Sequence, residues 1–102
     1  MENKNKEKVL NLIGLATRAR LTSMGTDIVI NSVQKNNAKI VFVASDASSE
    51  TIKKIQDKCN YYKIICSTLF DTNELNNACG KNNIKVISIN DKGFSESIKP
   101  LI

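Results

Sequence analysis

The sequence predicts an α/β sandwich in which helices cover both faces of a small central sheet. Segments with apolar residues at helical spacing alternate with short β-branched runs along the chain. One such run, KIVFVA at residues 39–44, is apolar almost throughout, which is typical of a central strand buried on both faces. The chain has 102 residues and no linker or internal repeat, so we expect one domain over residues 1–102.

The first half of the chain begins with a predicted helix from residue 6 to residue 17, where apolar residues recur at helical spacing. Gly14 lies inside this helix, which indicates close packing against a neighbouring element. Residues 21–22 fit a very short strand. Ser23 is expected to be the N-cap of a second helix that runs to Lys35.

The second half repeats the alternation of helix and strand. Asp71 and Glu74 have the spacing of a capping box, which predicts a helix start, and Gly80 is placed to end that helix. The predicted elements are a helix at 49–60, a strand at 63–66, a helix from the cap at 71 to residue 79, a strand at 84–89 and a helix at 91–99.

The composition excludes several kinds of chemistry. The chain has no histidine, which removes catalysis by a histidine base and most zinc sites. Cys59, Cys66 and Cys79 have the spacing of neither a CxxC motif nor a zinc ribbon, so we expect reduced core thiols. The first residues form neither a signal peptide nor a membrane anchor. We therefore expect a cytoplasmic, non-enzymatic monomer with no cofactor, no metal and no membrane partner.

A basic segment before the second helix is the strongest functional signal. The net charge of +5 favours polyanionic partners. Arg18 and Arg20 precede a turn, led by Gly25, that enters the helix. A helix N-terminus favours anions, glycine lets a ligand approach the backbone, and arginine matches phosphates and guanine edges. The segment predicts a nucleic-acid surface, with RNA as the favoured partner.

Several segments resemble the 7Ae/30e family of large-subunit ribosomal proteins, whose members bind kink-turn RNA. The most specific of them is DASSETIKKIQDKCNYYK at residues 46–63. The others are GLATRAR at 14–20, the turn at 23–28, Leu75, ACGK at 78–81 and DKGF at 91–94. Together they cover nearly the whole chain and are closest to a small bacterial branch of the family. The resemblance implies a three-layer α-β-α sandwich with a mixed four-stranded sheet.

In that family the turn into the second helix carries the pattern G-T-N-E-x-x-K, which recognises a sharply bent RNA with tandem sheared G·A pairs. Gly25 and Thr26 match the pattern, whereas Asp27, Ile28 and Asn31 replace its asparagine, glutamate and lysine. Aspartate only accepts hydrogen bonds, and isoleucine cannot accept one from a guanine amino group. The resemblance thus implies changed RNA specificity, with the backbone amides of Gly25 and Thr26 available for contact.

The family's second RNA contact is the loop before the last strand, here residues 80–83. The resemblance implies a non-catalytic protein in or near the translation machinery, with structured RNA, including ribosomal RNA, as the expected partner. The predicted RNA-binding residues are Arg18, Arg20, Ser23, Gly25, Thr26, Asp27, Ile28, Asn31, Gly80, Lys81, Asn82 and Asn83.

Alternatives remain open for individual residues and for the function. Asp27 in the first turn of a helix is also favourable through the helix dipole alone. Ile28 is expected in the core with Val29 and Val33. If Ile28 is instead exposed beside Met24, the fold suits a protein–protein adaptor that has lost kink-turn specificity. An enzyme would need a cofactor loop or paired cysteines, and the sequence has neither GxGxxG nor CxxC.

Overall fold

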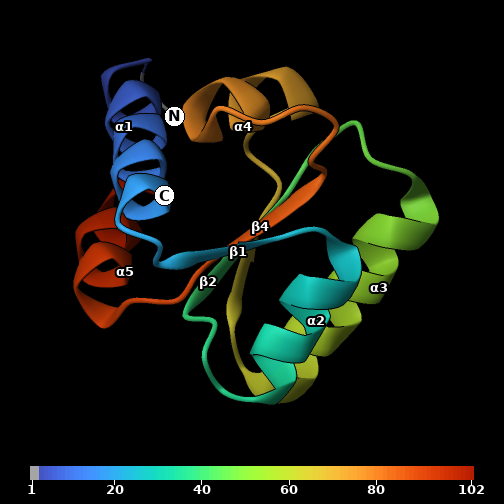
Figure 1. Ribbon diagram of the computed structural model, residues 1–102. Helices are drawn as coiled ribbons and strands as arrows, with labels where there is room; N and C mark the ends of the chain where they lie inside the picture. Colours follow the sequence, from blue (N-terminus) through green and yellow to red (C-terminus); the bar gives the residue numbers. More distant parts are fainter. Residues whose placement is uncertain (1–2) are drawn as a thin grey trace.

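The computed structural model describes residues 3–102 as three layers, with a mixed sheet between two layers of helices (Figure 1). In chain order the elements are α1 (Asn3–Arg18), β1 (Thr22–Met24), α2 (Thr26–Gln34), β2 (Ile40–Val43), α3 (Ser49–Tyr62), β3 (Ile65–Ser67), α4 (Thr72–Cys79), β4 (Val86–Ile89), α5 (Lys92–Ile98) and a final 3₁₀ turn (Lys99–Leu101). The helices α1, α4 and α5 cover one face of the sheet, and α2 and α3 cover the other. The predicted fold class is confirmed.

The sheet has the strand order β1-β4-β2-β3. β4 runs antiparallel to both β1 and β2, and β2 runs parallel to β3. Ile40 and Phe42 of β2 face α1, α4 and α5, whereas Val41 and Val43 face α2 and α3. All four side chains are buried, which confirms the prediction of a central strand covered on both faces.

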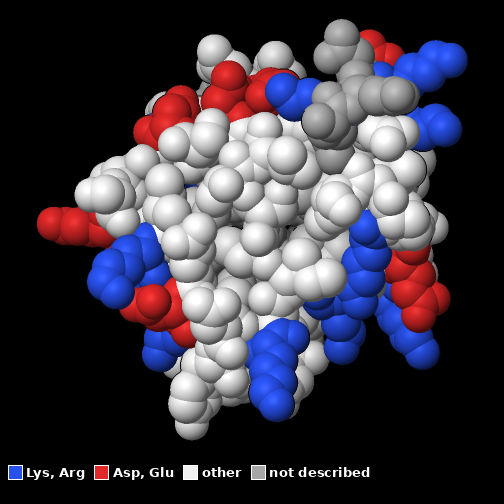
Figure 2. Space-filling view, turned by 180° about the vertical axis from the view of Figure 1, so that it is seen from behind, with Lys and Arg blue, Asp and Glu red and all other residues white. Residues whose placement is uncertain are grey.

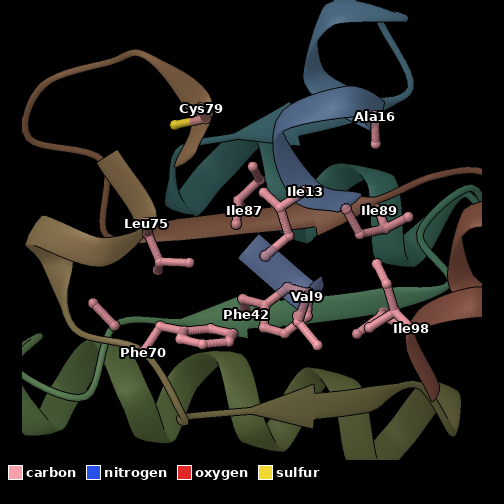
Figure 3. Packing of buried hydrophobic residues seen from close by; sticks show 12 residues of the cluster. Val9, Ile13, Ala16, Phe42, Phe70, Leu75, Cys79, Ile87, Ile89 and Ile98 are labelled. Atoms are coloured by element: carbon pink, nitrogen blue, oxygen red, sulfur yellow. The ribbon is translucent and has the colours of Figure 1, made fainter. Parts of the chain in front are cut away.

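The larger core lies between the sheet and the layer of α1, α4 and α5 (Figure 3). Val9 and Ile13 of α1 pack with Phe42 and Ile87 of the sheet, and all four are essentially inaccessible to solvent. This burial anchors α1 along most of its length. The last turn of α1, which ends at Arg18, therefore has a fixed position relative to β4.

The sequence signals for helix packing and for the ends of α4 are confirmed. A Cβ on Gly14 of α1 would lie 2.9 Å from the carbonyl oxygen of Ala78, so α1 and α4 approach closely at this point. Asp71 and Glu74 form the predicted capping box, and Gly80 ends α4 in the left-handed conformation with a φ of 69°. The cap at Gly80 thus fixes where α4 ends and where the loop before β4 begins.

The predicted role of Ser23 as a helix cap is wrong. Ser23 lies within β1, where it pairs with Ser88 of β4, and α2 begins only at Thr26. Pairing with a neighbouring strand, which sequence propensity does not reveal, extends β1 beyond the predicted residues 21–22. Further differences include the start of α1 at Asn3, the end of α3 at Tyr62, the ranges 40–43 for β2, 65–67 for β3 and 86–89 for β4, and the end of α5 at Ile98, so that Pro100 lies in the 3₁₀ turn.

Candidate nucleic-acid interface

The turn between β1 and α2 depends on Gly25. Its φ of 95° and ψ of 148° lie in a region that residues with a Cβ avoid. Gly25 is the N-cap of α2, and its N–H donates to the carbonyl oxygen of Val86 at a distance of 2.9 Å. No atom lies within 4 Å of the position that a Cβ would occupy. The backbone therefore requires glycine here, and the surface in front of the turn is open.

The start of α2 has no side-chain cap. Three other helices are capped at their starts by side chains: Ser48 for α3, Asp71 for α4 and Asp91 for α5. Because the first N–H groups of a helix have no partner within the helix, those of α2 are left for water or a ligand. The expectation that the Gly25 amide is available is wrong, since that amide is bonded to Val86. The unpaired amides begin at Thr26.

The first turn of α2 displays Asp27 and Ile28. The Asp27 side chain is 95% exposed and lies 3.9 Å from Nζ of Lys54 of α3, a loose surface pair of little energetic weight. Ile28 is 61% exposed, so the expectation that it belongs to the core is wrong. At roughly 100° per residue, Ile28 points roughly 120° away from the centre of the face formed by Val29 and Val33. Sequence reasoning missed Lys54 because its position depends on the packing of α2 against α3.

Ser23 takes part in a hydrogen-bond network that joins β1, β4 and α2. Its hydroxyl oxygen accepts from Nδ2 of Asn90 at 2.8 Å. Oδ1 of Asn90 accepts from the hydroxyls of Ser88 at 2.8 Å and of Ser32, in α2, at 3.2 Å. Asn90 thereby holds α2 against the sheet. No signal in the sequence pointed to this role, because an asparagine after a strand is typical of any turn.

The second predicted segment, residues 80–83, is exposed between α4 and β4. Asn76 holds the far end of this loop: its Oδ1 accepts from the N–H of Ile84 at 2.9 Å, and its Nδ2 donates to the carbonyl oxygen of the same residue at 3.3 Å. β4 then begins at Val86, which accepts the hydrogen bond from Gly25. The structure thus places the turn into α2 against the start of β4, the strand that follows this loop.

The two arginines lie away from the start of α2, so the expectation that they flank it is wrong. Arg18 ends α1, and Arg20 occupies a left-handed turn with a φ of 63°. β1 separates them from Gly25. The carbonyl oxygen of Leu21 accepts a hydrogen bond from the N–H of Asn90, just after β4 ends, whereas the N–H of Gly25 donates to Val86, where β4 begins. A strand of four residues extends over about 10 Å.

Arg18 lies close to the second segment instead. Its Nη1 is 3.7 Å from the position that a Cβ on Gly14 would take, and its side chain lines a groove together with Ala78 of α4. Ala78 precedes Gly80 by two residues. The structure therefore groups the predicted residues into a turn at the start of α2, with exposed Asn31 one turn later, and a loop with Arg18 beside it.

The charges around the site are mixed. Near the loop, Nζ of Lys85 donates to the hydroxyl of Thr72 at 3.0 Å, and that hydroxyl donates to Asp46 at 2.6 Å. The hydrogen bond from the Thr72 hydroxyl, followed by that from its N–H, lowers the pKa of Asp46 below its usual value. On the face seen from behind, Lys and Arg side chains lie around the rim among Asp and Glu, and the central area carries few charges (Figure 2). That face is not a continuous basic surface.

The remaining side chains of interest are the three cysteines. Cys59 and Cys79 are buried, Cys66 is half-buried, and all three are free thiols. Within residues 3–102 the structure contains no group of three or more Cys, Asp or Glu side chains placed to hold a metal ion. Over the same residues, none of the helices has the length and apolar character needed to cross a membrane.

The three-layer fold, together with the glycine turn facing the loop before β4, defines a class of protein. The sequence model of the Ribosomal protein L7Ae/L30e/S12e/Gadd45 family matches residues 7–99, and the chain belongs to this family. Within it, the chain is similar to two curated proteins that are both named RNA-binding protein YlxQ. It is 44% identical over 102 residues to that of Enterococcus faecium (100% of this chain, 98% of the relative) and 40% identical over 91 residues to that of Bacillus subtilis strain 168 (89% and 91%).

Solved structures share the fold over almost the whole chain. A Bacillus halodurans protein described as having unknown function is 38% identical, with a TM-score of 0.88 over 92% of this chain and 95% of that one. The Giardia lamblia 15.5kD RNA binding protein is only 18% identical, yet its TM-score is 0.82 over 100% of this chain and 93% of its own. The second likeness concerns the fold alone.

Proposed function

We propose that this protein binds structured RNA of the kink-turn class without catalysing a reaction, in or near the ribosome in the bacterial cytoplasm. The RNA lies across the first turn of α2 and the loop at residues 80–83. The observation that carries the proposal is the hydrogen bond from Gly25 to Val86, because it sets the uncapped start of α2 beside that loop. Membership of the family and the names of the two YlxQ relatives support RNA as the ligand.

The two segments have different tasks in this proposal. The free amides from Thr26 onward bind a phosphate oxygen at the helix N-terminus. Thr26, Asp27 and Asn31 contact base edges, Ile28 packs on a base or sugar, and Ser23, bonded to Asn90, positions the turn. Arg18, Arg20 and the exposed residues Lys81, Asn82 and Asn83 contact the backbone on the loop side. Phosphate contacts supply most of the affinity, so binding weakens as salt rises.

A binding experiment with matched charge variants tests the proposal. Fluorescence anisotropy compares a labelled kink-turn RNA with a duplex of equal length that lacks the sheared pairs. We expect tighter binding of the kink-turn RNA, and a loss of about ten-fold in affinity for the double variant Arg18→Ala/Arg20→Ala, with a smaller salt dependence. The control Lys35→Ala/Lys58→Ala removes the same charge from the C-cap of α2 and from α3.

The control decides between a site and general charge. Equal weakening by the two double variants would mean that only the net charge attracts RNA. Equal affinity for the kink-turn RNA and the duplex would refute the kink-turn assignment. Circular dichroism of each variant checks that the fold is retained.

A protein–protein adaptor is the second candidate, because Ile28 is 61% exposed. Met24, the expected partner of Ile28 in an apolar patch, packs instead against the core on the side of the sheet covered by α1, α4 and α5. The apolar surface at the turn is therefore narrow. The variant Ile28→Ser separates the two functions. If the turn contacts RNA, the variant binds RNA several-fold more weakly than the wild type. If the protein is an adaptor, the wild type does not bind RNA, and a protein that cross-links to the wild type no longer cross-links to the variant.

A further inference from the structure

A groove between α1 and α4 lies on the far side of the loop from the start of α2. Its volume is about 670 Å³, which is within the usual range for small-ligand sites. Asn11, Leu15 and Arg18 of α1 line it, at spacings that place them on one face of the helix, opposite Asn77 and Ala78 of α4. The absence of a side chain at Gly14 lets the two helices approach closely enough to form its floor.

The groove presents three kinds of contact. Arg18 lies at one end, and within residues 3–102 no Asp or Glu forms an ion pair with it. Asn11 and Asn77 are exposed, and each amide has both a donor and an acceptor. Leu15, 47% exposed, adds an apolar surface between Asn11 and Arg18. A guanidinium, two amides and an apolar wall match the phosphate, the base edge and the base face of one nucleotide.

The only carboxylate that lines the groove, within the described residues, does not oppose an anion strongly. Oε2 of Glu74 lies 2.9 Å from Nζ of Lys6, so its charge is largely compensated. The end of the groove where Arg18 lies adjoins the loop at residues 80–83, because Ala78 lies beside Arg18 there and α4 ends at Cys79. An RNA strand that crosses the loop can therefore enter the groove without turning away from the protein.

We infer that the groove between α1 and α4 binds an unpaired adenine nucleotide next to the RNA element that contacts the start of α2. Adenine is the best match, since an asparagine amide pairs with its N6 amino group and N7. Arg18 binds the phosphate and Leu15 covers the base. The inference rests on the proposed function for the source of the nucleotide, while the groove itself can be tested separately.

The test is an NMR titration of ¹⁵N-labelled protein with a single-stranded RNA pentamer of adenosines. We expect shifts of the side-chain amides of Asn11 and Asn77 and of the backbone amide of Leu15. Asn11→Ala/Asn77→Ala should raise the Kd for the pentamer about ten-fold. The control Asn37→Ala/Asn60→Ala changes two exposed asparagines on the side of the sheet covered by α2 and α3 and should leave it within about two-fold.

Each other outcome has a definite meaning. Shifts confined to the first turn of α2, identical shifts with inorganic phosphate alone, or equal effects of the two double variants would overturn the inference. Pentamer binding in the groove without kink-turn binding refutes the proposed function and leaves the groove intact. Kink-turn binding without pentamer shifts at Asn11 and Asn77 refutes the groove alone.

Discussion

The N–H of Gly25 lies 2.9 Å from the carbonyl oxygen of Val86, and this hydrogen bond joins the turn into α2 to the strand that follows the loop at residues 80–83. The two segments are more than fifty residues apart in the chain, at 25 and at 80–83. The hydrogen bond sets an uncapped helix start against the strand that follows an exposed polar loop. Four predictions follow from the geometry of this surface and of the elements that support it.

The two glycines of the surface should tolerate asparagine differently. Neither Gly25 nor Gly80 has an atom within 4 Å of its Cβ position, so substitution causes no clash at either site. Gly80, at φ 69° and ψ 32°, has the left-handed conformation that asparagine accepts, whereas Gly25, at φ 95° and ψ 148°, does not. Gly25→Asn should cost about 1–3 kcal/mol in the free energy of unfolding and Gly80→Asn less than about 1. Urea unfolding measures both, and equal losses would contradict the assignment of backbone strain.

Restoring the family pattern at the start of α2 should strengthen kink-turn binding. Asp27→Asn, Ile28→Glu and Asn31→Lys together supply a donor, a carboxylate acceptor and a positive charge at three exposed positions. One well-formed base contact contributes about 1–3 kcal/mol, so we expect a gain of at least about ten-fold in affinity. Isothermal titration calorimetry measures it. Unchanged affinity of the folded triple variant would place RNA recognition elsewhere on the molecule.

Glu74 should make stability depend on pH in the acidic range. The hydrogen bond from Lys6, followed by that from the backbone of Asp71, lowers the pKa of Glu74 below its ordinary value of 4.5. The unfolded chain then binds a proton more readily than the folded chain, so the stabilisation is complete above pH 4.5 and is lost as the pH falls through the lower folded-state pKa. Glu74→Gln keeps an acceptor for the cap but removes the charge.

Thermal unfolding of the wild type and Glu74→Gln between pH 7 and pH 3 provides the measurement. The difference in Tm should be largest near neutral pH and should shrink below about pH 4. Glu96→Gln is the control, since that side chain is 62% exposed and lies 4.0 Å from Lys92. A difference that stays constant with pH would mean that the Glu74 charge adds nothing to stability.

Cys66 should be the reactive thiol. A hydrogen bond with Cys59 lowers the pKa of Cys66, and the same bond, together with burial, raises the pKa of Cys59. Cys66 is also the only one of the three that is not buried. Iodoacetamide should therefore modify Cys66 first, with a pH midpoint below the ordinary value of 9.0. Mass spectrometry should show this midpoint shifted upward in Cys59→Ala and unchanged in the control Cys79→Ala. An unchanged midpoint in Cys59→Ala would rule out the thiol pair.

Local chemistry made much of the fold predictable. The capping box at Asp71, the left-handed Gly80 and the apolar run at residues 39–44 each act through neighbours in the chain, and each was confirmed. The ends of the short strands were less predictable, because β1 and β3 depend on partners from distant segments. Ser23 illustrates the difference: its side chain suits a helix cap, yet strand pairing and Asn90 hold it in the sheet.

The site divides in the same way. The sequence by itself determined the layered α/β fold and the glycine turn, since these depend on periodicity and on backbone conformations that only certain residues adopt, whereas the loop at residues 80–83 was predicted from the resemblance to the family. Only the tertiary structure decided that Arg18 lies beside α4, that Ile28 is exposed and that Gly25 meets Val86. The physical reason is that an extended β1 carries the chain along the edge of the sheet from the arginines to the helix, and its direction is fixed by pairing with β4, a strand from the other end of the sequence.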